Sequence, residues 1–193
     1  GMSRWNFRRF AYAVENPATL PKPPANDSNG DVRLLYVGSL IHRKGVDVLL
    51  DALATRGLKD RNWRLTLIGD GDQRDALTTQ AEQLGISDRI TFTGSLPRER
   101  CLAEYADSNV LILPSRFDGW GAVVNEAMES GLAVVASDRV GARTPLIEHG
   151  TNGLVFRSES APSLAFSLSA LIGDPERLED MQQASLERVL ACR

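Results

Sequence analysis

The chain has 193 residues, of which 42% are hydrophobic and 24% are charged, and its formal net charge is -3. This composition is that of a globular domain with room for one substantial core. Lysine and arginine (22) are outnumbered by aspartate and glutamate (25), so we expect no nucleic acid partner. The longest uncharged stretch, residues 160–173, is shorter than the roughly 20 apolar residues that cross a bilayer, and no apolar signal region opens the chain.

The cysteines and the first residues of the chain indicate its redox state and its place in a longer protein. Cys101 and Cys192 lie far apart and lack the spacing of a zinc site, so we expect reduced thiols in a cytoplasmic protein and no metal centre. Gly1 before Met2 resembles the residue left when an expression tag is removed, and we expect the chain to be part of a longer protein. Residues 1–30, with many aromatic, basic and proline residues, are interpreted as an N-terminal extension or interdomain linker.

From residue 31 to residue 193 we expect one domain in which short apolar runs alternate with helical patterns. Strands are predicted at 32–38, 63–69, 90–94, 110–114 and 133–137. Helices are predicted around 46–53, 77–84, 123–128 and 164–171, with a last helix that opens at Asp174 and Pro175. The strands are nearly continuous in Leu, Ile and Val, which is typical of parallel strands covered on both faces. We therefore predict an α/β fold with a doubly wound, Rossmann-like parallel sheet, which binds ligands at the carboxyl ends of its strands.

The first candidate site is the segment Gly-Ser-Leu-Ile-His-Arg-Lys-Gly at residues 38–45, between the first strand and the first helix. A helix start with Arg43 and Lys44 suits a phosphate, because N–H groups and cations both favour negative charge there. The spacing is neither that of a Walker P-loop nor that of the dinucleotide fingerprint. The alternative is a solvated helix start.

The second candidate site follows the fourth predicted strand, at Pro-Ser-Arg-Phe-Asp-Gly-Trp-Gly, residues 114–121. Gly119 and Gly121 allow the backbone to approach a ligand, and the next helix would direct its first N–H groups toward it. Asp118 and Glu126 lie eight residues apart. Each carboxylate has acceptors for the two hydroxyl donors of a vicinal diol, so the pair suits a sugar beside a phosphate. The alternative is that Asp118 caps the helix and Glu126 is solvated surface.

Three further sets of residues carry weaker signals. Backbone groups at Gly94 would read a base edge while Leu96 packs on its ring. Gly-Asp-Gly-Asp at 69–72 lacks the ligand spacing of a calcium loop and is interpreted as a turn with a helix cap. Surface or loop positions without a chemical role are expected for His42, His149 and Ser115.

Seven blocks, taken in order, resemble the C-terminal, donor-binding domain of retaining GT-B glycosyltransferases of family 4, the glycosyl transferases group 1. The blocks are 37–45, 67–71, 90–94, 113–115, 118–128, 131–138 and 150–154. The resemblance runs from residue 32 nearly to the end of the chain and implies one half of a GT-B fold. It also implies a UDP-, GDP- or ADP-sugar donor, with no metal or other cofactor. A hexose-type sugar would pass, with retention of configuration, to a glycan or lipid-linked acceptor. That acceptor, and any peripheral membrane association, would depend on an N-terminal domain absent from this chain.

The same resemblance implies roles for individual residues. Lys44 would contact the donor diphosphate, Glu126 the ribose hydroxyls, and Asp118 the donor sugar. The whole donor-binding set is Gly38, Ser39, Arg43, Lys44, Gly94, Leu96, Asp118, Gly119, Trp120, Gly121 and Glu126. The catalytic residues would be Asp118, Lys44 and Arg43, the two cations stabilising the leaving diphosphate.

Two departures from the family pattern bear on these roles. Ser39 stands where the family usually has arginine, and Arg43 is expected to supply that cation. Asp118 replaces the more usual glutamate and is one methylene shorter. Two other functions stay open: a non-catalytic module that binds a nucleotide or sugar phosphate, and a sugar-nucleotide epimerase, against which the block from Asp118 to Glu126 argues. We expect the chain alone to bind donor weakly and to transfer little sugar.

Overall fold

The computed structural model describes residues 30–191, so Cys192 and nearly all of the expected linker lie outside the described part. Six strands form one sheet in the order β3-β2-β1-β4-β5-β6, and every neighbouring pair is parallel. The strands are β1 (Val32–Val37), β2 (Trp63–Ile68), β3 (Ile90–Gly94), β4 (Val110–Leu113), β5 (Ala133–Ser137) and β6 (Gly153–Phe156). The predicted α/β fold with a doubly wound parallel sheet is confirmed.

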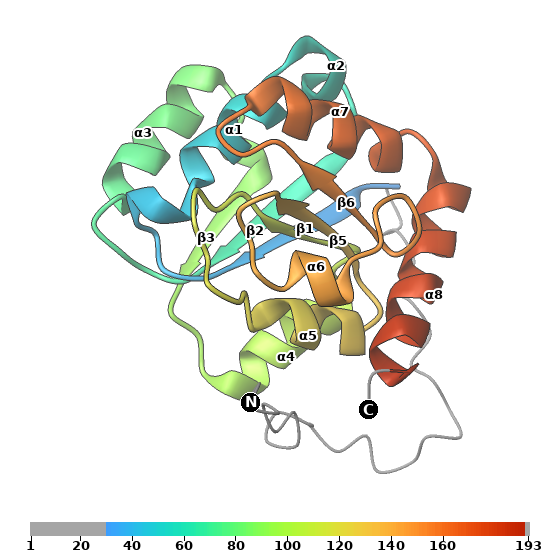
Figure 1. Cartoon of the computed structure of the whole chain (residues 1–193). Helices are drawn as coiled ribbons and strands as arrows, with labels where there is room; N and C mark the ends of the chain where they lie inside the picture. Colours follow the sequence, from blue (N-terminus) through green and yellow to red (C-terminus); the bar gives the residue numbers. More distant parts are fainter. Residues whose placement is uncertain (1–29, 192–193) are drawn as a thin grey trace.

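Helices cover both faces of the sheet (Figure 1). Their bounds are α1 (Val46–Leu53), α2 (Arg56–Lys59), α3 (Arg74–Leu84), α4 (Arg98–Asp107), α5 (Val123–Glu129), α6 (Arg143–Leu146), α7 (Ala161–Ile172) and α8 (Pro175–Ala191). Two short 3-10 helices, η2 (His42–Lys44) and η3 (Ser87–Arg89), precede α1 and β3.

Side chains alternate between two hydrophobic cores, one on each face of the sheet. In β1, Leu34 belongs to the core under α1, α2, α3 and α7, whereas Leu35 belongs to the core under α4, α5 and α6. Helix α8 packs into both, because Met181 lies in the first core and Val189 in the second. Strands buried on both faces in this way explain the nearly continuous apolar runs in the sequence.

The strand order reverses direction between β1 and β4. The chain builds β1, β2 and β3 outward on one side, then returns to add β4, β5 and β6 on the other side of β1. At such a reversal the connections leave the two neighbouring strands in opposite directions and open a crevice at their carboxyl ends. The two candidate loops, after β1 and after β4, both follow these strands.

Sequence and structure differ in several particulars. Three strands end one residue before the predicted Gly38, Gly69 and Pro114. The strand β6 was not predicted, since it has four residues and begins with glycine. Helix α4 was not predicted because half of its residues are charged and it buries only Tyr105. The last helix begins as predicted, and Asp174 Oδ1 accepts a hydrogen bond from the Arg177 N–H at 3.1 Å. Within residues 30–191, no helix is long and apolar enough to span a membrane.

Candidate functional site

The loops after β1 and β4 are bound to each other at the reversal of strand order. The Arg116 N–H donates to the Arg43 carbonyl at 2.9 Å, and Arg43 Nη1 donates to the Phe117 carbonyl at 2.7 Å. These reciprocal bonds join residues 73 and 74 positions apart in the chain. Both candidate segments therefore belong to one site, as their places after β1 and β4 predict.

Lys44 and Asp118 form the central ion pair of this site. Lys44 Nζ lies 2.5 Å from Asp118 Oδ2, and the two side chains are only 19% and 14% exposed. A charge-assisted bond with so little contact with water is stronger than an exposed ion pair. Arg43, Lys44 and Asp118, taken by themselves, carry one net positive charge.

A glycine makes the close approach of the two loops feasible. Gly45 has φ of 68° and is the N-cap residue of α1, directly after Lys44. A Cβ atom at this position would overlap the carbonyl oxygen of Pro114, the residue directly after β4. The absence of a side chain at Gly45 thus permits the contact between η2 and the segment that carries Asp118.

Asp118 is held by its own turn and does not cap α5. Its Oδ1 accepts a hydrogen bond from the Trp120 N–H at 3.3 Å, and its N–H donates to the Arg139 carbonyl at 3.1 Å. The N-cap residue of α5 is Ala122, which makes no side-chain cap hydrogen bond. The alternative reading of Asp118 as a helix cap is therefore wrong.

The first turn of α5 leaves fewer N–H groups free to bind a ligand than the sequence suggested. The Val124 N–H donates to the Gly121 carbonyl at 2.9 Å, and the Asn125 N–H donates to the Ala122 carbonyl at 3.2 Å. These two groups are engaged inside the chain. The loop before them is open to solvent, since Gly119 and Trp120 are exposed, and the Trp120 side chain is 40% exposed.

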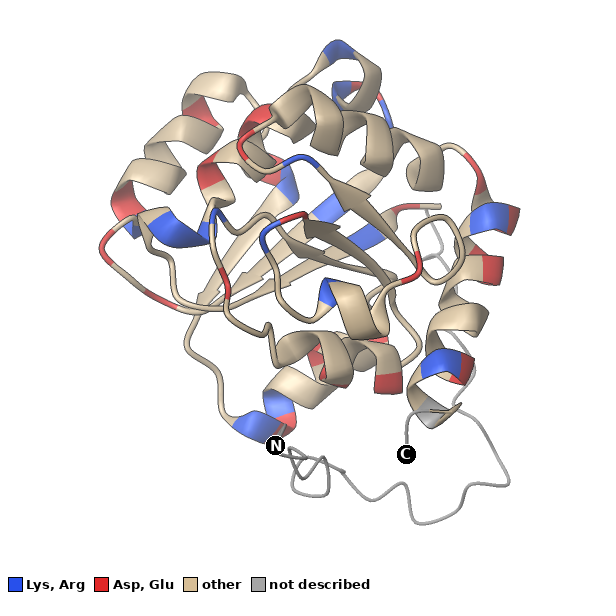
Figure 2. Ribbon diagram, viewed as in Figure 1, with Lys and Arg blue, Asp and Glu red and all other residues tan. Residues whose placement is uncertain are grey.

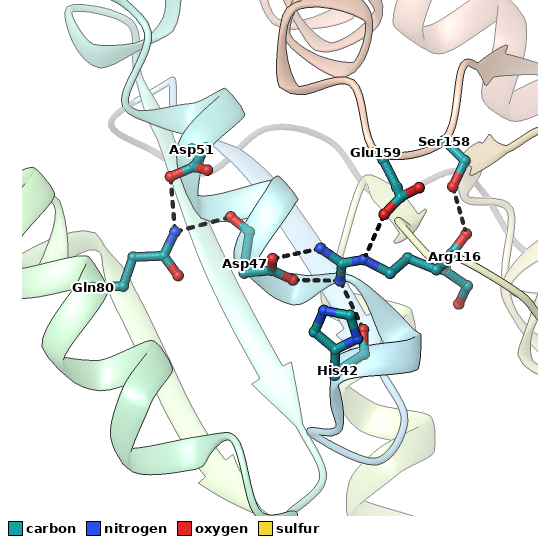
Figure 3. Close-up of polar contacts among 8 residues, drawn as sticks. His42, Asp47, Asp51, Gln80, Arg116, Ser158 and Glu159 are labelled. Atoms are coloured by element: carbon teal, nitrogen blue, oxygen red, sulfur yellow. Dashed lines mark hydrogen bonds and ion pairs between the residues drawn. The ribbon is translucent and has the colours of Figure 1, made fainter.

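Arg116, for which the sequence suggested no role, is the most connected side chain of the site (Figure 3). Its Nη1 and Nη2 donate to the two carboxylate oxygens of Asp47, on α1, at 2.8 and 2.7 Å. Its Nε donates to Glu159 at 3.1 Å, and its Nη1 also donates to the His42 carbonyl at 2.7 Å. Its place in the glycine-rich segment was visible in the sequence, but its partners on α1 and before α7 were not.

The charges of this cluster influence one another. Hydrogen bonds to Asp47 raise the pKa of Arg116 despite its burial. Burial alone raises the pKa of Asp47, but the bonds to Arg116 and its charge outweigh this, so the pKa of that carboxyl lies below its ordinary value. Gln80 of α3 extends the network, since its Nε2 donates to Asp51 Oδ1 at 2.7 Å and to the Asp47 carbonyl at 3.1 Å (Figure 3).

Glu126 is half-buried and binds a buried tyrosine. The hydroxyl of Tyr105, in α4, donates to Glu126 Oε2 at 3.0 Å, and Tyr105 is 1% exposed. Burial and then the nearby charge of Glu126 raise the pKa of Tyr105. Burial and then Glu126 also raise the pKa of the Cys101 thiol. Glu126 is thus not a fully solvated surface residue, and no sequence pattern pointed to its bond with Tyr105.

The remaining predicted donor-binding residues lie along the same edge of the sheet. The Gly38 N–H donates to the Ile68 carbonyl at 2.9 Å, and the exposed Ser39 accepts a hydrogen bond from the Tyr36 hydroxyl at its carbonyl, 2.9 Å away. Gly94 ends β3, two strands from β1, and Leu96 packs partly against the second core.

Other polar residues singled out in the sequence have structural contacts. The Asp70 carboxylate accepts a hydrogen bond from the Gly71 N–H at 2.8 Å, which fits the predicted turn, but α3 has Gln73 at its N-cap and no side-chain cap. His149 Nδ1 accepts from the Val155 N–H at 2.9 Å. The Ser115 carbonyl accepts from the buried Ser137 hydroxyl at 2.5 Å.

Within residues 30–191, no three His, Cys, Asp or Glu side chains are grouped so that they could hold a metal ion. Cys101 is a free thiol. Figure 2 shows basic and acidic residues interspersed on helices of both faces rather than separated by sign.

Known proteins resemble this chain over most of its length. The family profile described as Glycosyl transferases group 1 matches residues 21–188. A D-inositol 3-phosphate glycosyltransferase from Nocardia farcinica is 36% identical over 159 residues, which cover 79% of this chain and 35% of that protein. The chain spans less than half the length of the first curated relatives that it matches.

Solved structures give the same result for the fold. A protein of Anabaena, HepE, solved in complex with UDP and glucose, aligns with a TM-score of 0.75 and 25% identity over 84% of this chain and 44% of its own. The C-terminal domain of a group 1 glycosyl transferase from Francisella tularensis has a TM-score of 0.75. Its 24% identity extends over 88% of this chain and 87% of that domain, and this likeness concerns the fold alone.

Proposed function

Because the chain belongs to the glycosyl transferases group 1 family and folds as one half of a GT-B enzyme, we propose that it binds the nucleotide-sugar donor of a retaining glycosyltransferase. The transferred sugar would be a hexose, and the acceptor a glycan or a lipid-linked glycan held by a separate N-terminal domain. Residues 1–30 would connect the two domains. The observation that carries the proposal is the pairing of Lys44 with Asp118 at the reversal of strand order.

The cations of this site suit the donor diphosphate. Lys44 Nζ has three donors, so it can keep its bond to Asp118 and still donate to a phosphate oxygen. Arg43 is exposed and has further guanidinium donors beyond the one that binds the Phe117 carbonyl. As the bond to the sugar breaks, negative charge grows on the leaving diphosphate, and these two cations would stabilise it.

The carboxylates suit the two sugar rings of the donor. Asp118 has one oxygen on Lys44 and the other near the Trp120 N–H, so its remaining lone pairs are the acceptors offered to the transferred sugar. Glu126 would accept hydrogen bonds from the ribose hydroxyls. Asp118 thereby serves both partners, since it orients Lys44 toward the diphosphate and accepts from the sugar beside it.

Backbone groups would complete the donor site. The exposed residues Gly119 and Trp120, and Gly121 after them, would donate N–H groups to the phosphates or the transferred sugar, and Gly38 and Ser39 would line the diphosphate. Gly94 and Leu96, at the end of β3, would line the base. The likeness to a structure that contains UDP and glucose supports a donor of this class.

Calorimetric titration of the 193-residue chain with UDP, GDP, ADP and their glucose or mannose derivatives tests the proposal. We expect one nucleotide to bind selectively, and binding to weaken about tenfold or more in Lys44→Ala and in Glu126→Ala, since each removes a charged hydrogen-bond partner. Arg64→Ala is the matched control, because Arg64 pairs with Asp31 at the opposite ends of the strands. Unchanged affinity in both site variants would contradict the proposed site. Rapid sugar transfer by this chain alone would contradict the proposal that a separate N-terminal domain holds the acceptor.

A further inference from the structure

We propose that Tyr105 is the positioning residue for ribose recognition: it fixes the carboxylate of Glu126 and so makes the site prefer ribonucleotide donors to deoxyribonucleotide donors. This inference rests on the proposed function, because it requires Glu126 to bind the ribose. It concerns a residue outside every block that suggested the donor site. It also assigns a task to a contact of the Glu126 side chain that joins α4 to α5.

The geometry joins two helices on the same face of the sheet. Tyr105 lies near the end of α4, and its ring is part of the core under α4, α5 and α6. Its hydroxyl donates to Oε2 of Glu126, in the first turn of α5, at 3.0 Å. Only 1% of Tyr105 is exposed, so packing fixes the ring and places the hydroxyl within narrow limits.

The hydroxyl of Tyr105 stays a donor under ordinary conditions. Burial and the charge of Glu126 both raise the pKa of Tyr105, so the phenol remains protonated well above neutral pH. An ionised carboxylate has acceptors and no donor, so the protonated phenol of Tyr105 donates the hydrogen bond and Glu126 accepts it.

This bond controls which acceptors Glu126 presents. A carboxylate has about four lone-pair positions, and Tyr105 uses one of them on Oε2. The last torsion of a glutamate side chain has a broad, roughly two-fold preference and is poorly fixed by itself. With Oε2 held by Tyr105, Oε1 and the free lone pair of Oε2 keep one direction, which is what two adjacent hydroxyl donors require. Without the phenol, the carboxylate can turn away from the diol.

The test compares ribose and deoxyribose forms of one nucleotide. UDP, GDP and ADP are titrated beside their 2′-deoxy forms, and the ratio of the two dissociation constants is measured for each pair. We expect the wild-type chain to favour the ribose form by about tenfold or more, the effect of a hydrogen bond to a charged group. In Tyr105→Phe we expect this preference to fall to about threefold or less, while the affinity for inorganic pyrophosphate stays the same.

Two controls separate positioning from general loss of structure. Tyr36→Phe removes the hydroxyl of another tyrosine, 2% exposed, which donates to the Ser39 carbonyl. This variant should change the affinities for ribose and deoxyribose forms equally and leave their ratio as in the wild type. In a Glu126→Ala background, Tyr105→Phe should produce no further change in the ratio. Phenylalanine keeps the ring of Tyr105, so the core stays filled. Thermal unfolding of each variant measures whether its stability is retained.

The outcomes distinguish this inference from the proposed function. If the wild-type chain prefers ribose and Tyr105→Phe keeps the full preference, the positioning role is wrong and the donor site stands. If the wild type binds a nucleotide with equal affinity in both forms, Glu126 does not read the ribose, and the inference fails with that assignment. If the wild type binds none of the three nucleotides, the donor site proposed for this chain is overturned, and the role of Tyr105 with it.

Discussion

Arg116 and Asp47 are joined by two parallel hydrogen bonds of 2.8 and 2.7 Å, which tie the loop after β4 to the first turn of α1. The same guanidinium reaches Glu159 and the His42 carbonyl. Two carboxylates therefore neutralise the positive charge of Arg116. The cations of this site that can bind an anionic ligand are Arg43 and Lys44. The role of Arg116 is to hold the turn that carries them.

Replacing Arg116 with methionine should therefore weaken both folding and nucleotide binding. The change leaves Asp47 without the partner of its two bonds, and we expect the free energy of unfolding to fall by about 1–3 kcal/mol. Urea denaturation measures this, and calorimetry with the best-binding nucleotide measures the second effect. Arg116→Lys keeps the charge without the planar fork and should restore only part of each loss. Full recovery by lysine would contradict a geometric role for the guanidinium.

Stability in acid should depend on Asp47. The pKa of this carboxyl in the folded chain lies below its ordinary value of 3.8. A lowered pKa means that its contribution to stability is fully present above the unfolded value and is lost as pH falls through the folded value. Chemical denaturation from pH 6 to pH 2 should show a smaller acid-induced loss of stability in Asp47→Asn than in the wild type. An unchanged pH profile would mean that the bond to Arg116 does not favour the ionised carboxyl.

Asp118→Asn should separate the binding of phosphate from the binding of sugar. The amide oxygen of asparagine can still accept the hydrogen bond that orients Lys44 but no longer neutralises its charge, so pyrophosphate and the nucleoside diphosphate should bind about threefold to tenfold more tightly. The corresponding nucleotide-sugar should gain less, because a carboxylate acceptor for its sugar is lost. Paired titrations of the diphosphate and the sugar-diphosphate give the difference. Weaker pyrophosphate binding would instead indicate that Lys44 needs Asp118 to hold its position.

Gly45→Ala tests the approach of the two loops. Its φ is 68°, and an added Cβ would overlap the Pro114 carbonyl oxygen. Strain and displacement together should lower the free energy of unfolding by about 2–4 kcal/mol. Gly85→Ala is a close control, because Gly85 has φ of 64° and its Cβ would meet only the end of the Lys59 side chain at 3.2 Å. In that variant the free energy of unfolding should fall by about 1 kcal/mol, the cost of a left-handed backbone conformation for alanine. Equal losses in the two variants would show that the contact with Pro114 is not decisive.

The fold and the location of the site could be predicted from the sequence because both depend on local patterns. Continuous apolar runs identified five of the six strands, and parallel strands place the loops that follow them at one edge. Lys44 and Asp118 were assigned to that edge by this reasoning, although they are 74 positions apart. The same reasoning failed for β6 and α4, whose sequences lack a long apolar run or an apolar face.

Individual contacts within the site could not be predicted in the same way. The bond from Arg116 to Glu159 depends on how the segment before α7 returns to the end of β4, across 43 positions of the chain. The bond from Tyr105 to Glu126 depends on the packing of a helix that the sequence did not reveal. Local spacing gives the place of a side chain on its own element, whereas its partner is fixed only when separate elements pack together.

The reciprocal contacts of Arg43 and Lys44 also affect the entropy of binding. Long cationic side chains lose about 1.5–2 kcal/mol of rotamer freedom each when they are fixed. Here Arg43 is already bound to the Phe117 carbonyl and Lys44 to Asp118, by contacts that lie wholly within this domain. Their ordering is therefore completed during folding. An anion that arrives at this edge meets two side chains already restrained, so a larger share of each new hydrogen bond is retained as affinity.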